Sequence, residues 1–195
     1  MSKTLLFLLT LVINVIFAGN LLDPLGYQIY GMYQDRLVMI GGRNETINDG
    51  YIQYLNLKYQ IVGKIGVLQM NVFCYSKCFD QINDVLYFVS QNKIYSYQLR
   101  MNIVNNPLTT IPMDTGFDGD YGCVTVNDNF ELYIMGGLIN NQTGNNTSDN
   151  VQKYSILTGV WHEMAPMINP RSSFTCENYN YSIYIFGGIN NFGLL

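Results

Sequence analysis

A run of four β-favouring apolar residues recurs four times along the chain and constrains its fold more than any other feature. Neighbouring runs start about fifty residues apart, and a run this short is typical of a strand buried on both faces. Three of them end in Gly-Gly, where a neighbouring segment can pass without a Cβ clash. The runs are Leu37–Ile40, Leu86–Val89, Leu132–Met135 and Ile183–Phe186, followed by Gly41-Gly42, Ser90-Gln91, Gly136-Gly137 and Gly187-Gly188.

Further strands are predicted on both sides of these runs. An upstream strand, separated from its run by a polar turn, is expected at 30–33, 123–126 and 174–176. A downstream strand is expected at 52–55, 94–97 and 151–154, and Val160-Trp161 supplies a fourth. Four short antiparallel strands per period predict the blade of a β-propeller.

The residues between Val151 and Gly188 identify the type of blade. Tyr154, Trp161, Arg171 and Gly187-Gly188 stand in the order of a kelch motif, and Gly41, Gly42 and Tyr54 repeat part of it in the first period. The chain therefore resembles the kelch-repeat family. The resemblance implies an all-β, kelch-type β-propeller whose loops bind partners and which, in most members, has no catalytic role.

The number of repeats predicts an incomplete ring. Repeats at approximately 24–66, 67–112, 113–166 and 167–195 amount to about three and a half four-stranded blades, whereas a propeller closes its ring to hide strand edges. Three arrangements are open: a fragment of a longer protein, two copies that complete a ring, or an arc capped by another protein. The first two predict exposed apolar blade faces at 27–32 and near the carboxyl terminus.

The amino terminus predicts export. Lys3 precedes an apolar run from Thr4 to Phe17, and the small residues Ala18-Gly19 follow. This order is typical of a signal peptide, and the run is shorter than the roughly twenty residues that span a bilayer. We expect residues 1–18 to be the signal, residues 19–195 to be the propeller, and the protein to be secreted or lumenal. Membrane attachment is expected only if the signal stays uncleaved.

The composition limits the kinds of partner that the chain can bind. Hydrophobic residues make up 48% and charged residues 12% of the chain, with sixteen Tyr and a net charge of −4. These values favour a β-rich globular domain and give no basic surface for nucleic acid.

The four cysteines, Cys74, Cys78, Cys123 and Cys176, suit an oxidising compartment. Cys74 and Cys78 are too far apart to bridge on a straight strand and would need a bulge or turn. Cys123 and Cys176 share a face of equivalent strands in successive repeats. Buried thiols are the alternative for both pairs.

N-glycosylation sequons follow the Gly-Gly runs or lie in a predicted hairpin turn, where surface loops are expected. The acceptor candidates are Asn44, Asn141, Asn145, Asn146 and Asn180.

No combination of residues predicts catalysis. The galactose-oxidase-like branch of the family implies a copper site with several His and Tyr ligands, but His162 is the sole histidine. We expect no enzyme activity, metal or other cofactor. Asp114, Asp118 and Asp120 share one loop with two glycines, which fits either a calcium site or an acidic solvated connection.

The sequence therefore predicts a secreted or lumenal scaffold that binds a protein or a glycan. Its candidate binding surfaces are the polar loop from Leu138 to Asn150 and an aromatic rim around Tyr121, Trp161 and Phe192, although these aromatic residues also suit packing between blades. Arg171 is expected to hydrogen-bond across blades. The alternative is the non-catalytic part of a secreted galactose-oxidase-like carbohydrate oxidase.

Overall fold

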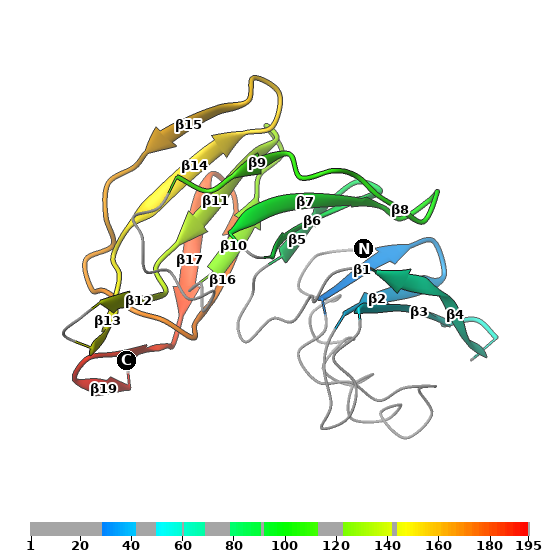
Figure 1. The fold of residues 1–195 in the computed structure, drawn as a ribbon, viewed down its shortest axis with the longest axis horizontal. Helices are drawn as coiled ribbons and strands as arrows, with labels where there is room; N and C mark the ends of the chain where they lie inside the picture. Colours follow the sequence, from blue (N-terminus) through cyan, green and yellow to red (C-terminus); the bar gives the residue numbers. More distant parts are fainter. Residues whose placement is uncertain are drawn as a thin grey trace.

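The computed structural model describes residues 29–41, 50–59, 61–68, 79–90, 92–112, 123–141 and 144–194. The regular elements in these ranges are all strands, and no helix there is long and apolar enough to cross a membrane. The strands form small antiparallel sheets that follow one another around an arc (Figure 1).

Four sheets correspond to the four repeats, and we call them blades 1 to 4. Blade 1 contains β1 (Ile29–Tyr33), β2 (Arg36–Ile40), β3 (Gly50–Asn56) and β4 (Ile61–Leu68). Blade 2 contains β5 (Phe79–Ile82), β6 (Val85–Ser90), β7 (Lys93–Gln98), β8 (Ile103–Val104) and β9 (Thr109–Thr110). Blade 3 contains β10 (Cys123–Val126), β11 (Glu131–Met135), β14 (Val151–Ser155) and β15 (Val160–Glu163). Blade 4 contains β16 (Thr175–Tyr179) and β17 (Ser182–Phe186).

Two further hairpins lie outside the blades. One consists of β12 (Leu138–Asn141) and β13 (Gly144–Thr147), and the other of β18 (Ile189–Asn190) and β19 (Gly193–Leu194). The first hairpin falls within the segment from Leu138 to Asn150, which was predicted to be a polar loop. That prediction is wrong for the residues of β12 and β13, because they form paired strands. Backbone pairing from Leu138↔Thr147 to Asn141↔Gly144 orders the segment in spite of its Asn-rich composition.

The apolar runs form the second strand of each blade, and their alternating side chains build the core. On β6, Leu86 and Phe88 pack toward blade 1, whereas Tyr87 and Val89 pack against Val124 and other residues of blade 3. The expectation of strands buried on both faces is therefore confirmed for the second repeat, although its run lacks Gly-Gly.

The first strands of successive blades lie side by side, β1 next to β5, β5 next to β10 and β10 next to β16. Gln81 of β5 accepts the N–H of Met32 at 2.7 Å and donates its amide to the Met32 carbonyl at 2.7 Å. Asp80, also on β5, accepts the Thr125 hydroxyl at 2.7 Å and the Val126 N–H at 2.9 Å. Each of these two junctions is therefore linked by a side chain that hydrogen-bonds to the neighbouring strand.

The third junction is covalent. Cys123 on β10 and Cys176 on β16 form a disulfide with their Cα atoms 5.9 Å apart, and both residues are buried. Phe174 and Met135 pack beside the bridge. Blade 4 is thus held to blade 3 by a cross-link and an apolar cluster together.

The prediction of an exposed apolar face at 27–32 is wrong for the described part, residues 29–32. Ile29 is fully buried because it packs against Phe79 and other residues of blade 2. Tyr30 packs on Phe79 as well, with ring centroids 4.7 Å apart, and both Tyr30 and Met32 pack beside Leu37 and Met39. Tyr27 lies outside the described residues.

Candidate functional site

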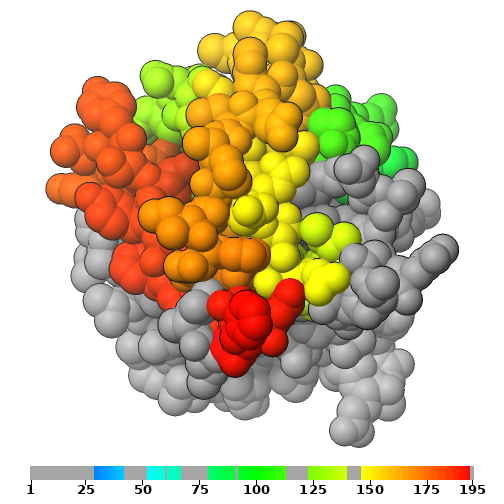
Figure 2. Space-filling model, turned by 90° about the vertical axis from the view of Figure 1, so that its left-hand side faces the viewer, coloured from blue at the N-terminus to red at the C-terminus, as the bar shows by residue number. Residues whose placement is uncertain are grey.

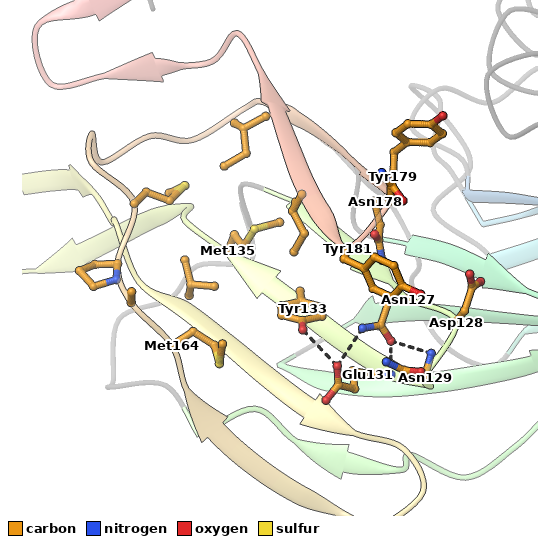
Figure 3. A pocket seen from close by; sticks show the side chains of 17 residues that line it. Asn127, Asp128, Asn129, Glu131, Tyr133, Met135, Met164, Asn178, Tyr179 and Tyr181 are labelled. Carbon is orange, nitrogen blue, oxygen red and sulfur yellow. Dashed lines mark hydrogen bonds between the residues drawn. The ribbon is translucent and has the colours of Figure 1, made fainter.

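A cleft of about 940 Å³ separates blade 4 from blade 3. Its walls come from β11, β14, the segment after β15 and the hairpin of β16 and β17 (Figure 3). In Figure 2 the yellow-to-orange surface of blade 3 and the red-orange surface of β16 and β17 appear on one face of the molecule. The cleft is polar at the end near Asn127 and apolar at the end near Met167.

A hydrogen-bond network organises the polar end around one carboxylate. Glu131 accepts Lys153 Nζ at 2.7 Å and Asn127 Nδ2 at 2.8 Å, and the Tyr133 hydroxyl donates to it at 3.2 Å. The hydrogen bond from Lys153, followed by that from Asn127, lowers the pKa of Glu131. The same ion pair raises the pKa of Lys153. Because its charge is matched, the network fixes the cleft wall and does not leave a reactive carboxylate.

The lowered pKa of Glu131 predicts an acid-dependent contribution to stability. A depressed pKa in the folded state stabilises the fold above the ordinary value of 4.5 and loses that effect as the pH falls through the lowered pKa. We expect Glu131→Gln to reduce the free energy of unfolding by about 1 kcal/mol at pH 7 and by much less at pH 3. Urea denaturation at both pH values measures this difference. Glu163→Gln removes an exposed carboxylate on β15 and is the control. Its effect on the free energy of unfolding should not differ between pH 7 and pH 3. An undiminished effect of Glu131→Gln at pH 3 would contradict the prediction.

The apolar end of the cleft adjoins a blade whose outer face is uncovered. Ile183 and Ile185 of β17 face blade 3, and the residues that alternate with them, Tyr184 and Phe186, are 49% and 57% exposed. The equivalent residues of β6, Tyr87 and Val89, are only 6% and 3% exposed because blade 3 covers them. The prediction of exposed apolar residues near the carboxyl terminus is therefore confirmed.

The hairpin turn at the mouth of the cleft adds two exposed aromatic side chains. Asn180 and Tyr181 form the two-residue turn between β16 and β17, both with positive φ. Tyr181 is 98% exposed and Tyr179 is 71% exposed. Figure 3 shows the Tyr181 ring near the polar end and the Tyr179 ring pointing away from it. We call Tyr179, Tyr181, Tyr184 and Phe186 the aromatic surface of blade 4.

The residues of the predicted kelch motif lie at the junctions between blades. Trp161 packs on Tyr154, with ring centroids 5.0 Å apart, and donates its indole N–H to Thr109 of blade 2 at 3.3 Å. Arg171 donates to the Gly187 carbonyl at 3.0 Å, while its own carbonyl accepts the Gly137 N–H at 2.9 Å. Arg171 thus hydrogen-bonds to both sides of the junction between blades 3 and 4, and Trp161 contributes to packing.

The remaining motif positions lie on the blade strands or directly after them. Gly41 and Gly136 directly follow second strands, and Gly187-Gly188 follow β17. Tyr54 lies on β3 with Arg36 over its ring at 5.2 Å. Gly42 lies outside the described residues.

The predicted glycosylation residues fall in different environments. Asn180 is exposed in its hairpin turn, and Asn146 is half-buried on β13, where its side-chain oxygen accepts the Asn191 amide at 3.2 Å. Asn141 lies on β12 and Asn145 on β13. Together with Asn146, they belong to a hairpin and not to a loop. Asn44 lies outside the described residues.

Two of the other site candidates lie within the described residues, and both are exposed. His162 is exposed on β15, and Phe192 is 97% exposed in the last hairpin. Asp114, Asp118, Asp120, Tyr121, Cys74 and Cys78 lie outside the described residues. Within the ranges that the structure covers, no three His, Cys, Asp or Glu side chains cluster as metal ligands would.

Sequence reasoning missed the cleft and the links between first strands. One signal was present for the links. The first strand of the second repeat contains two adjacent polar residues, Asp80 and Gln81, at a position in the repeat that is otherwise apolar. No comparable signal marks the cleft, which depends on how blade 4 sits against blade 3.

The successive antiparallel sheets, joined through their first strands, define a partial β-propeller. Residues 120–168 match the family model described as the Kelch motif. This part of the chain therefore contains a kelch motif, which supports the resemblance to the kelch-repeat family.

A solved structure titled "Structure of YjhT" is similar to this chain, with 19% sequence identity and a TM-score of 0.49. The similarity covers 57% of this chain and 33% of that chain, so this chain spans about a third of its length. No curated protein matches the sequence.

Proposed function

We propose that this chain is a secreted or lumenal scaffold, not an enzyme, and that it binds a protein partner at the cleft between blades 3 and 4. The kelch motif supports a role in protein interaction. The observation that carries the proposal is the aromatic surface of blade 4, of which Tyr179 and Tyr181 line the cleft while Tyr184 and Phe186 are exposed on the outer face of β17. Clustered exposed aromatic residues mark interaction sites because they bury much area at little cost in conformational entropy.

Substitution of the aromatic surface tests the binding site. Tyr179→Ser/Tyr181→Ser is expected to abolish capture of partners identified by proximity labelling on the secretory route. Tyr59→Ser is the matched control, because Tyr59 is 63% exposed but lies in the turn between β3 and β4 of blade 1. Unchanged capture by the double variant would refute the site. If the chain is retained on a glycan array and no protein is captured, the partner is a glycan and not a protein.

Deletion of residues 2–18 tests the location. The intact chain is expected in the culture medium or in the secretory lumen, with residues 1–18 removed, whereas the shortened chain should stay in the cytosol. Mass spectrometry of the mature amino terminus measures the cleavage. Recovery of the intact chain in the cytosol with residues 1–18 still attached would contradict the proposed compartment.

A further inference from the structure

We infer that Asn180 carries an N-linked glycan and that Asn146 does not, an inference that rests on the secretory location within the proposed function. Both residues begin a sequon, Asn180-Tyr181-Ser182 and Asn146-Thr147-Ser148, so the sequence alone does not distinguish them. A glycan is bulky and needs a surface position in the folded chain. The environment of each asparagine therefore decides between the two.

The sequon of Asn180 is exposed along its whole length. Tyr179 pairs with Ser182, so Asn180 and Tyr181 form a two-residue turn between β16 and β17. Their φ angles are +50° and +63°, and positive φ at both positions is typical of a tight hairpin. Asn180, Tyr181 and Ser182 are all exposed. The turn therefore has room for a glycan.

The same turn is exposed in a blade that has neighbours on both sides. Asn83 holds the position of Asn180 in blade 2, as the first residue of the two-residue turn between β5 and β6, with a φ of +52°. Asn83 and Asp84 are exposed although blades 1 and 3 pack on the two faces of blade 2. The exposure of Asn180 is therefore a property of this turn and does not depend on what covers the outer face of blade 4.

Asn146, in contrast, is held in a contact between two hairpins. Its Oδ1 accepts the Asn191 amide at 3.2 Å, and Asn191 Oδ1 accepts the Thr147 N–H at 3.0 Å and the Thr147 hydroxyl at 3.3 Å. Asn146 is half-buried, and Ser148, whose hydroxyl completes its sequon, is 4% exposed. The hairpin of β18 and β19, which carries Asn191, would have to move to admit a glycan at Asn146.

The attachment is a group transfer from a lipid-diphosphate-linked oligosaccharide of the secretory lumen. Asn180 Nδ2 forms a bond to C1 of the first sugar while the bond between that carbon and the diphosphate oxygen breaks. The amide nitrogen gives up one proton, and the lipid diphosphate leaves. The Ser182 hydroxyl is the third element of the sequon that this transfer requires.

The test is mass spectrometry of the full chain produced in a eukaryotic cell line, then reduced and digested with trypsin. Cleavage after Arg171 gives a peptide of residues 172–195 whose single sequon is that of Asn180, whereas Asn146 falls in the peptide of residues 101–153. Enzymatic release of an N-linked glycan converts the modified asparagine to aspartate. We expect this conversion at Asn180 and not at Asn146.

Two substitutions of Ser182 are the matched variants. Ser182→Ala removes the hydroxyl of the sequon and leaves Asn180 in place, so the peptide of residues 172–195 should lose the glycan. Ser182→Thr retains a hydroxyl and should keep the glycan. Ser173→Ala changes a serine of the same peptide outside the sequon and should also keep it.

Three results would overturn the inference. An unmodified Asn180 in chains that have lost residues 1–18 would refute the glycan site and leave the proposed location intact. A glycan on Asn146 would show that the contact with Asn191 does not exclude one. Recovery of the chain in the cytosol with residues 1–18 attached would refute the location as well, and sequencing of the mature amino terminus distinguishes this result from the first.

The proposed scaffold function is tested independently of the glycan. The variant used in the capture experiment, Tyr179→Ser/Tyr181→Ser, keeps Asn180 and Ser182, so its sequon is complete. Ser182→Ala removes the sequon and keeps both tyrosines. Loss of capture in the first variant and loss of the glycan in the second therefore report on different properties of the same hairpin.

Discussion

Replacing Cys123 and Cys176 together by alanine is expected to lower the free energy of unfolding by about 4 kcal/mol. The two cysteines are 53 residues apart in sequence, so the bridge restricts a long loop of the unfolded chain. It is also the covalent link between the first strands of blades 3 and 4. Without it, blade 4 depends on the small apolar cluster around Phe174 and on hydrogen bonds such as those of Arg171.

Urea denaturation of the double variant and of the unaltered chain measures this effect. The midpoint should fall, and the transition should broaden if blade 4 separates before the other blades unfold, since unfolding then ceases to be two-state. A loss below about 1 kcal/mol would show that the bridge contributes little to the fold. Ser173→Ala, an exposed neighbour of Cys176, is expected to change stability by less than about 0.5 kcal/mol.

Asp80→Ala is expected to lower the free energy of unfolding by about 3 kcal/mol. The substitution removes the acceptor of the Thr125 hydroxyl and the Val126 N–H, which lie in the buried junction between β5 and β10. Donors left in the interior without an acceptor carry their full desolvation cost. Asp80→Asn keeps an oxygen acceptor and should lose less than Asp80→Ala.

Asp84→Ala is the matched control for this effect. Asp84 is exposed in the turn between β5 and β6, so its removal is expected to cost less than about 0.5 kcal/mol. Equal losses for Asp80→Ala and Asp84→Ala would show that the link between β5 and β10 does not stabilise the junction.

The repeat period and the Gly-Gly pairs predicted the blades because each pattern reflects the conformation of a few residues that are neighbours in the sequence. Gly136 shows why: its φ is +59°, and a Cβ there would stand 2.5 Å from the Arg171 carbonyl oxygen. The positive φ favours glycine whatever surrounds the residue, and the approach of the Arg171 carbonyl adds a long-range reason for it. The strands and the position of Arg171 follow from similarly local patterns.

The links between blades could not be predicted in the same way. Whether Cys123 meets Cys176, or Gln81 meets Met32, depends on the stagger of β10 against β16 and of β1 against β5, which strand alternation alone leaves undetermined. The hairpin of β12 and β13 escaped prediction because its Asn-rich sequence has low β propensity and is ordered by contacts such as that of Asn146 with Asn191.

The hairpin of β12 and β13 also bears on how this fold changes in length. It leaves blade 3 after Met135 and returns before Val151, and these two residues still pair directly with each other. The blade ladder therefore continues as though the intervening segment were absent. The connection between a second and a third strand is accordingly a place where sequence can be inserted, by evolution or by an engineer fusing an epitope or a fluorescent domain, without shifting the register of the blade.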